Sequence, residues 1–219
     1  MVEKITLSNT LPQVFTGMEH EVPVSLSQVW LQNIEFARPN YYMVEAESGT
    51  GKSSLCSYIY GSRGDYRGKI LFDGRDVSEF TIEQWCELRT RSLAYLPQEM
   101  QLFPELTVLE NIEIKNRLTG CKSREWILEA LERLEISVKA DVLAGKLSVG
   151  QQQRVAIIRA LCQPFDFILI DEPVSHLDQR NNNIVAHLIQ EEAQSNGASI
   201  LATSVGNKIN IPITHTYKL

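Results

Sequence analysis

Apolar runs and alternating stretches divide the chain into candidate strands. Residues 29–36 alternate between apolar and polar side chains at period two, and residues 41–44 form a short apolar and aromatic run. Residues 165–170 and 199–203 are two further apolar runs. A strand that is apolar on both faces is typical of a parallel sheet covered by helices. The pattern therefore predicts an α/β fold with a mostly parallel central sheet.

A hairpin and a block of helices complete the predicted architecture. Residues 68–77 contain Asp73-Gly74, a strong signal for an antiparallel β-subdomain. Helical spacing of apolar positions predicts a helical subdomain over about residues 99–147, inserted in a single domain that spans residues 1–219. Further strands are predicted over residues 4–8, 92–96 and 214–219, and further helices over residues 52–60, 81–89, 150–162 and 178–194.

Composition narrows the function classes. The 219 residues are 43% hydrophobic, enough for one large domain, and the net charge of −6 argues against broad nucleic-acid binding. No run of about eighteen apolar residues predicts a membrane span, and the first residues lack the apolar core of a secretory signal. The four cysteines lack C-x-x-C spacing, and Cys56 and Cys162 are expected to be buried, reduced thiols of a cytoplasmic protein.

The most informative stretch is residues 46–54, AESGTGKSS, directly after the run 41–44. A strand, a tight glycine loop and a helix form the layout of a phosphate-binding P-loop, although an ordinary glycine-rich turn has the same pattern. Gly49 and Gly51 let successive N–H groups point into one concavity. Lys52 would reach the β- and γ-phosphates, and the Ser53 hydroxyl would be a ligand of Mg²⁺.

Two adjacent acids follow the apolar run at residues 165–170. Asp171 would lie at the carboxyl end of a central parallel strand, near the P-loop, where ligands of open α/β sheets bind. This position suits Asp171 to hold Mg²⁺ through water, and Glu172 to polarise an attacking water. The alternative is a strand that ends in solvated acids.

Further segments in the expected order carry a resemblance to a known family. Residues 94–98, followed by 102–112, are similar to the Q-loop and the start of the helical subdomain. Residues 147–154 (LSVGQQQR) are similar to the signature, residues 170–173 (IDEP) to Walker B, and residues 175–178 (SHLD) to the D-loop. With these motifs the chain resembles the ATP-binding cassette subunits of ABC transporters, a P-loop NTPase fold. In style it is most similar to the small cassettes of lipoprotein release and macrolide export, or to the cell-division cassette.

The resemblance implies ATP and Mg²⁺ as cofactors and an ATP-dependent homodimer, paired head to tail, that drives a separate transmembrane permease from the cytoplasmic face of the membrane. It implies three sets of residues. The nucleotide set is Ser48, Gly49, Thr50, Gly51, Lys52, Ser53, Ser54, Phe15, Ser148, Gly150 and Gln151; the magnesium set is Ser53, Gln98 and Asp171; the catalytic set is Glu172, Gln98, Lys52 and Ser204. Phe15 is the candidate for stacking on adenine, with a plain core role as the alternative.

The chain departs from the family pattern at three positions. Ala46 replaces a glycine of the P-loop, and Val149 replaces the first glycine of the signature. More seriously, Ser204 follows Thr203 where the family has its switch histidine, and losing such a donor can cost on the order of a hundredfold in rate. His176 could approach the site from the D-loop, or lie on the surface or at an interface.

These departures leave three functions open. The leading one is an energy-coupling ATPase, and the second is an ATP-dependent dimerisation switch that hydrolyses slowly or hardly at all. A cassette without a permease is disfavoured, because the translation-type members carry two cassettes and this chain holds one.

Overall fold

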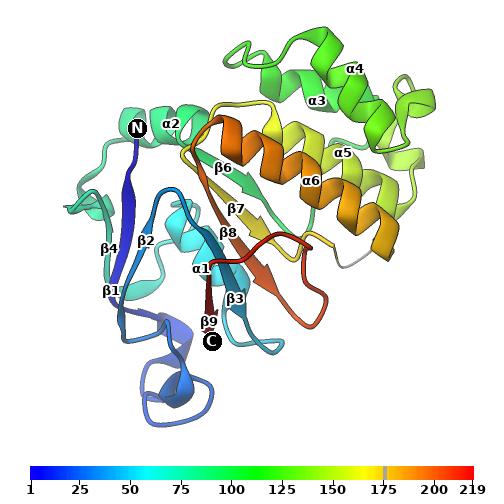
Figure 1. Cartoon of the computed structure of the whole chain (residues 1–219). Coiled ribbons are helices and arrows are strands. Elements are labelled where there is room, and N and C mark those ends of the chain that lie inside the picture. The colour runs from blue at the N-terminus through cyan, green and yellow to red at the C-terminus, as the bar shows by residue number, and fades with distance from the viewer. Residues whose placement is uncertain (175–176) are drawn as a thin grey trace.

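Two sheets and six α-helices form the parts of the computed structural model that are described, residues 1–174 and 177–219 (Figure 1). The parallel sheet has the order β6-β7-β8-β3-β9, and the antiparallel sheet has the order β2-β1-β4-β5. The parallel strands are β6 (Leu93–Leu96), β7 (Phe167–Asp171), β8 (Ser199–Ser204), β3 (Tyr41–Glu45) and β9 (His215–Lys218). The antiparallel strands are β2 (Asn33–Ala37), β1 (Lys4–Pro12), β4 (Tyr66–Phe72) and β5 (Arg75–Asp76).

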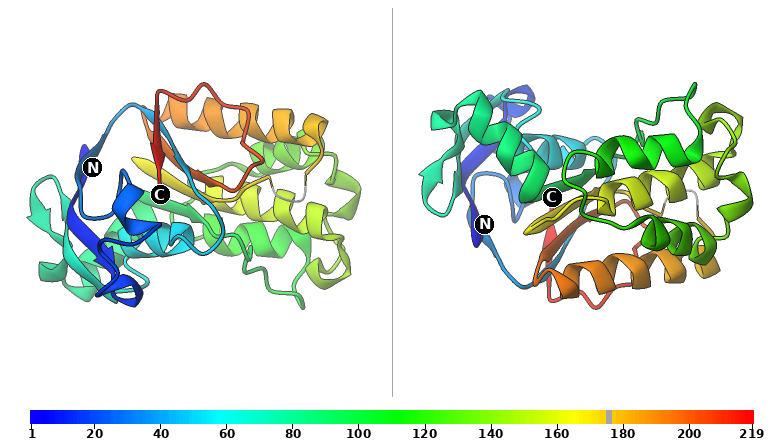
Figure 2. Two further views of the ribbon diagram at one scale, coloured as in Figure 1. Left: turned by 90° about the horizontal axis from the view of Figure 1, so that it is seen from below. Right: turned by 90° about the horizontal axis from the view of Figure 1, so that it is seen from above.

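Six α-helices follow one another in the described part of the chain. They are α1 (Lys52–Ile59), α2 (Ile82–Arg91), α3 (Val108–Asn116), α4 (Arg124–Arg133), α5 (Val149–Leu161) and α6 (Gln179–Ser195). Five short 3-10 turns lie in the connecting segments: η1 (Gln13–Phe15), η2 (Val24–Leu26), η3 (Val77–Glu79), η4 (Ser137–Lys139) and η5 (Ala144–Lys146). Helix α5 contacts α3, α4 and α6, so it connects the helical insertion to the central layer (Figure 2).

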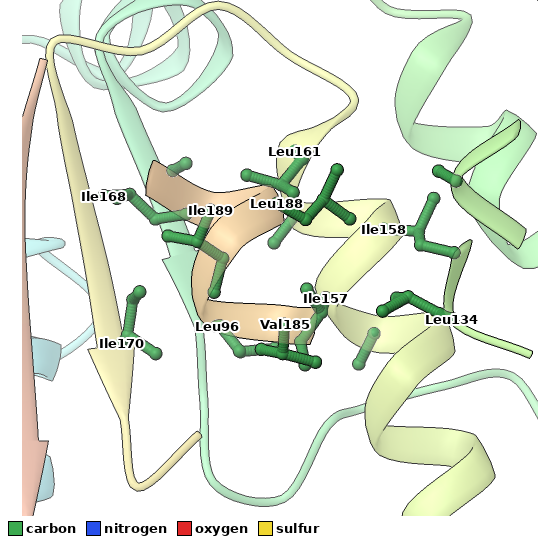
Figure 3. Packing of buried hydrophobic residues seen from close by; sticks show 14 of the residues in the cluster. Leu96, Leu134, Ile157, Ile158, Leu161, Ile168, Ile170, Val185, Leu188 and Ile189 are labelled. Atoms are coloured by element: carbon green, nitrogen blue, oxygen red, sulfur yellow. The ribbon is translucent and has the colours of Figure 1, made fainter. Parts of the chain in front are cut away.

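Alternate residues of the central strands face two different cores. Ile168 and Ile170 of β7 belong to the core under α5 and α6, where they meet Leu96, Val185 and Ile189 (Figure 3). Phe167 and Leu169 of the same strand belong to the core that α1 shares with the antiparallel sheet. All five residues of β7 are buried. Burial on both faces is why this segment reads as a nearly continuous apolar run.

The observed architecture confirms the predicted α/β fold: a parallel sheet around the P-loop and acidic strands, an antiparallel β-subdomain, and helices inserted in the chain between β6 and β7. The hairpin turns at Asp73 and Gly74, both with positive φ. Helices α3 and α4 lie within the proposed subdomain of residues 99–147. Among the described residues, none of the helices has the length and apolar character needed to cross a bilayer.

One predicted strand was wrong over half of its length. The strand expected over residues 29–36 exists only as β2, Asn33–Ala37. The Ser27 hydroxyl accepts the backbone N–H groups of Val29 and Trp30, and Leu31 has a φ of +59°, so the chain turns here instead of extending. Alternating polarity alone did not reveal this turn.

A buried polar contact holds the helical insertion to α6. The indole Nε1 of Trp126 donates to Glu192 at 3.0 Å, and the Lys122 ammonium pairs with the same carboxylate. The Lys122 and Glu192 side chains expose only 14% and 10% of their surface. A charge pair this deep depends on both partners being present.

We predict that Glu192→Ala lowers the free energy of unfolding by about 3 kcal/mol, because it leaves the Lys122 charge buried without its partner. The neighbouring Glu191→Ala is the matched control: Glu191 pairs with Arg133 on the surface, where its side chain is 54% exposed, and a loss below about 1 kcal/mol is expected. Urea denaturation of both variants measures the difference. Equal losses would contradict this account.

The cysteines differ in reactivity because they differ in burial. Cys56 and Cys162 are buried, and Cys86 and Cys121 are exposed. Burial raises the pKa of the Cys56 thiol well above its ordinary value and raises the pKa of Cys162 to about 12. Burial also raises the pKa of Cys121.

We predict that a disulfide reagent at about pH 8 modifies Cys86 first, then Cys121, and reaches Cys56 and Cys162 only after denaturation. The thiolate is the reactive form, so a raised pKa lowers the reactive fraction at a given pH, and the Cys121 rate rises with pH up to that pKa. Colour release with time measures the phases. A Cys86→Ser variant must lose the fastest phase, and four equally fast thiols in the native protein would contradict the prediction.

Candidate functional site

The loop between β3 and α1 has the closed geometry that the glycine pattern predicted. Gly49 and Gly51 have φ values of +85° and +98°, in the left-handed region that favours glycine. The Lys52 ammonium donates to the Glu47 carbonyl at 2.8 Å, and the Thr50 hydroxyl donates to the same oxygen at 2.9 Å. These two bonds curl the loop around the first turn of α1.

A cavity of about 390 Å³ opens at this loop. It lies at the carboxyl end of the parallel strands, where ligands of open α/β sheets bind. Its lining consists of Ser48, Gly49, Gly51, Lys52, Ser53, Ser54, Gln98, Glu172 and Val205. The fold thus brings the Q-loop glutamine and the Walker B glutamate to the P-loop, as predicted. Thr50, another predicted residue, is buried with 7% of its surface exposed and is not part of this lining.

The two adjacent acids occupy different places, as the sequence predicted. Asp171 ends β7 with 1% of its surface exposed and accepts the Thr203 hydroxyl at 2.6 Å. Glu172 follows with a φ of +50°, which turns it out of the strand, and its Oε1 lies 3.8 Å from Lys52 Nζ. The Asp171 carboxylate is therefore buried against Thr203 at the end of the sheet, whereas Glu172 lines the cavity.

The oxygen donors at this edge fit a magnesium ion carried by phosphates. Ser53 supplies an exposed hydroxyl, Gln98 an amide oxygen and Asp171 a carboxylate, all oxygen ligands that Mg²⁺ prefers. Over the described residues, no three His, Cys, Asp or Glu side chains gather in a metal-binding group. Because Ser53, Gln98 and Asp171 include only one carboxylate, most coordination positions of the ion would be filled by water and phosphate oxygens, as is usual for Mg²⁺.

The structure corrects the prediction for Ser204. This residue exposes 2% of its surface, and its hydroxyl donates to the Asn207 carbonyl at 2.7 Å. It does not line the phosphate cavity, where the next residue, Val205, stands instead with 41% exposure. The motif pattern of the sequence does not reveal Val205, because the path of the loop after β8 decides which of two neighbouring side chains lines the cavity.

The structure also corrects the prediction for Phe15. This residue ends η1 with 8% of its surface exposed and belongs to the core beneath the antiparallel sheet. Its ring edge lies behind Gly51, about 3.5 Å from where a Cβ would stand. The ring is therefore covered rather than free to stack on adenine, in agreement with the alternative that the sequence left open.

The signature residues stand apart from the cavity. Ser148 caps α5 and forms a capping box with Gln151, with Gly150 between them in the first turn. None of these three lines the cavity. Val149 exposes 48% of its side chain beside them. A single chain thus presents the P-loop and the signature as two separate surfaces.

The D-loop falls only partly within the described residues. Ser175 and His176 lie outside them, and so does the suggestion that His176 approaches the site. Asp178 caps α6 by accepting the N–H of Asn181 at 2.8 Å, which holds the pKa of its carboxyl below the ordinary value. Asp178 therefore has a structural role as a helix cap.

Comparison with known proteins settles the family. The sequence pattern of the family described as "ABC transporter" matches residues 32–175. The chain belongs to the ABC transporter family. Its place in that family makes it an ATP-binding cassette.

Individual relatives agree with this placement. The ABC transporter ATP-binding protein YtrE of Bacillus subtilis is 35% identical over 188 residues, which cover 84% of this chain and 80% of the relative. The lipoprotein-releasing system ATP-binding protein LolD of Oleidesulfovibrio alaskensis is 30% identical over 213 residues, or 95% of this chain and 91% of LolD. A dimeric post-hydrolysis structure of the ATP-binding cassette MJ0796 with ADP and Pi superposes with a TM-score of 0.75 at 25% identity, covering 93% of this chain and 88% of that one.

We predict that Gly51→Ala weakens ATP binding more than Gly49→Ala does. Both alanines meet a positive φ, which costs about 1 kcal/mol, but only at Gly51 does the added Cβ meet a ring, 3.0 Å from Cζ2 of Trp30. At Gly49 nothing lies within 4 Å of the added atom. Titration calorimetry with Mg²⁺-ATP measures both variants. Equal affinities would show that the ring behind the loop has no effect.

Proposed function

We propose that this protein binds ATP with Mg²⁺ and hydrolyses it, as the ATP-binding subunit that drives a separate membrane permease. One observation carries the proposal: the cavity combines Lys52, the left-handed glycine loop and the Glu172 carboxylate within one lining. An anion concavity at a helix N-terminus suits phosphates, and a carboxylate opposite it suits activation of water.

The residues at the cavity have different proposed roles toward the phosphates, Mg²⁺ and the attacking water. Lys52 holds the β- and γ-phosphates once they displace its Glu47 carbonyl and its Glu172 neighbour. Ser48, Ser54 and the loop N–H groups bind the remaining phosphate oxygens. Ser53 and Gln98 supply oxygens to Mg²⁺, and Asp171 reaches it through water. Glu172 orients the attacking water, so that P–O cleavage proceeds in line with the leaving ADP.

A head-to-tail homodimer completes the proposed site. Ser148, Gly150 and Gln151 do not line the cavity of their own chain, so a partner subunit would have to bring its signature to this P-loop. The dimeric structure of the MJ0796 cassette with ADP and Pi supports dimerisation. ATP then favours the closed dimer and its hydrolysis releases it, which moves the permease.

The helical subdomain is the proposed contact with the permease. Phe103, Ile114, Leu118 and Leu128 are 45%, 41%, 61% and 43% exposed there. Exposed apolar residues on one subdomain suit contact with a protein partner. The names of YtrE, an ABC transporter ATP-binding protein, and of LolD, the ATP-binding protein of a lipoprotein-releasing system, support a role as the ATP-binding part of a transporter. A cassette that drives a permease in this way would lie at the cytoplasmic face of the membrane.

A slow-hydrolysing switch is the second candidate function. Where a hydrogen-bond donor would stabilise the γ-phosphate, the cavity wall carries the apolar Val205, and the Ser204 hydroxyl is engaged with Asn207. The missing donor would cost on the order of a hundredfold in rate. The two candidates share ATP binding and dimer closure and differ only in turnover.

We predict that Glu172→Gln lowers steady-state ATP hydrolysis at least about a hundredfold while ATP binding persists. The matched control is Glu129→Gln on the exposed face of α4, which is expected to leave the rate unchanged. Phosphate release measures turnover, and size-exclusion chromatography with ATP measures closure, which the Gln variant should prolong. Absence of ATP binding by the unmodified protein would contradict the proposed function.

Val205→His decides between the two candidates. It places an imidazole on the cavity wall, whereas Ser204→His would have to displace a buried side chain. If the unmodified protein turns over and Glu172→Gln abolishes this, the protein is an ATPase without the switch histidine. If it binds ATP without turnover and Val205→His restores the rate, it is a switch.

A further inference from the structure

The floor beneath the P-loop is aromatic. Trp30 has 0% of its surface exposed, and its indole Nε1 donates to the Thr50 carbonyl at 3.0 Å. Its Cζ2 lies 3.0 Å from where a Cβ at Gly51 would stand, and Cε2 of Phe15 lies 3.5 Å from that point. A ring this close supports the loop from the side opposite the cavity.

We infer that Trp30 is a positioning residue for nucleotide binding: its indole fixes the Thr50–Gly51 peptide so that the Gly51 N–H points at the phosphates. The inference rests on the proposed binding of ATP at this loop. It adds a residue outside the P-loop that touches no substrate and acts only through the backbone it holds.

The geometry of one peptide unit connects the two sides of the loop. The Thr50–Gly51 bond is trans, and in a trans unit the C=O and the N–H point in opposite directions. The carbonyl of this unit points at buried Trp30, while Gly51 lines the cavity. The N–H of the same unit is therefore directed toward the cavity. By fixing the Thr50 carbonyl, the Trp30 indole therefore also fixes the direction of the Gly51 N–H.

Trp30 is itself fixed by bonds that do not involve the P-loop. The Ser27 hydroxyl accepts the N–H of Trp30 at 2.8 Å, and the N–H of Leu31 donates to the Thr10 carbonyl at 3.0 Å. Gln28 pairs with Lys218 of β9 in both directions, each bond at 2.8 Å. The indole is thus anchored to β1 and β9 before any nucleotide arrives, which is the preorganisation that phosphate binding needs.

The other two tryptophans of the chain lie elsewhere, which makes a sharp control available. Trp126 is partly buried and its Nε1 donates to Glu192 at 3.0 Å, a bond of the same length in the helical insertion. Trp85 packs edge-on against Phe72 and Phe80 of the antiparallel subdomain. Neither residue lines the phosphate cavity.

We predict that Trp30→Phe weakens binding of Mg²⁺-ATP and Mg²⁺-ADP about three- to tenfold, the loss of one neutral hydrogen bond. KM for ATP should rise while kcat changes less than about twofold, because the Gly51 donor is used in both the ground and transition states. Trp126→Phe removes an indole bond of the same length, to the Glu192 carboxylate, and should leave both affinities within about twofold. Titration calorimetry on the full chain measures the affinities, and steady-state phosphate release measures KM and kcat.

Indole ¹⁵N–¹H spectra supply a readout that a purely structural role would not move. Of the three indole signals, assigned with the Trp→Phe variants, the Trp30 signal should shift on addition of Mg²⁺-ADP and the Trp126 signal should not. If Trp30→Phe fails to fold, as circular dichroism will show, benzothienylalanine at position 30 keeps the ring shape without the N–H donor and must weaken binding by the same factor.

The outcomes separate this inference from the proposed function. If the unmodified protein binds ATP and the position-30 variant binds it equally well, or the Trp30 signal does not shift, the positioning role is wrong and the proposed function stands. If the unmodified protein and Trp126→Phe both fail to bind ATP, the proposed function is wrong and this inference falls with it.

Discussion

The parallel pairing of β7, β8 and β3 is the constraint on which the candidate site depends. Their register sets Asp171 opposite Thr203 and Glu45 opposite Ser204, so all three strands end at one edge. The P-loop, the acidic pair and the loop after β8 therefore emerge side by side although they are far apart in the chain. A slip of one residue would turn Asp171 to the other face and break its bond with Thr203.

Burial on both faces makes this edge rigid. The core under α5 and α6 fixes one side of the sheet, and the core that includes α1 fixes the other. Trp30 and Phe15 extend the second core up to the back of Gly51. The nucleotide loop thus rests on packed rings, while the signature lies on α5 beside the helical insertion. This division suits a rigid P-loop that binds phosphates and a separate signature surface on α5 that would meet the partner subunit when the proposed dimer closes.

Lys52 is the electrostatic centre of the cavity. Its side chain is only 5% exposed, and it lies between the Glu47 carbonyl and the Glu172 carboxylate. A buried ammonium needs such partners, because desolvation penalises an unpaired charge. In the proposed function, an entering phosphate would provide a stronger partner for Lys52 and would free Glu172 to face a water molecule. Exchange of the partner of Lys52 would then connect nucleotide binding with hydrolysis, and Val205 would add no hydrogen-bond donor to the cavity lining.

Local chemistry explains which features the sequence alone determined. The P-loop glycines and the two-sided apolar strand at β7 depend on short-range geometry, so their pattern was enough to predict the α/β fold and the P-loop part of the cavity lining. The resemblance to the family added Gln98 to that lining. Only the tertiary structure decided the directions of Ser204, Val205, Phe15 and Trp30. The Trp30 indole donates to the carbonyl of Thr50, 20 residues along the chain, whereas the Ser204 hydroxyl donates to the carbonyl of Asn207 in the loop that follows β8. The pattern of apolar and polar residues does not record these contacts, because one joins distant segments and the other depends on how an irregular loop folds back on itself.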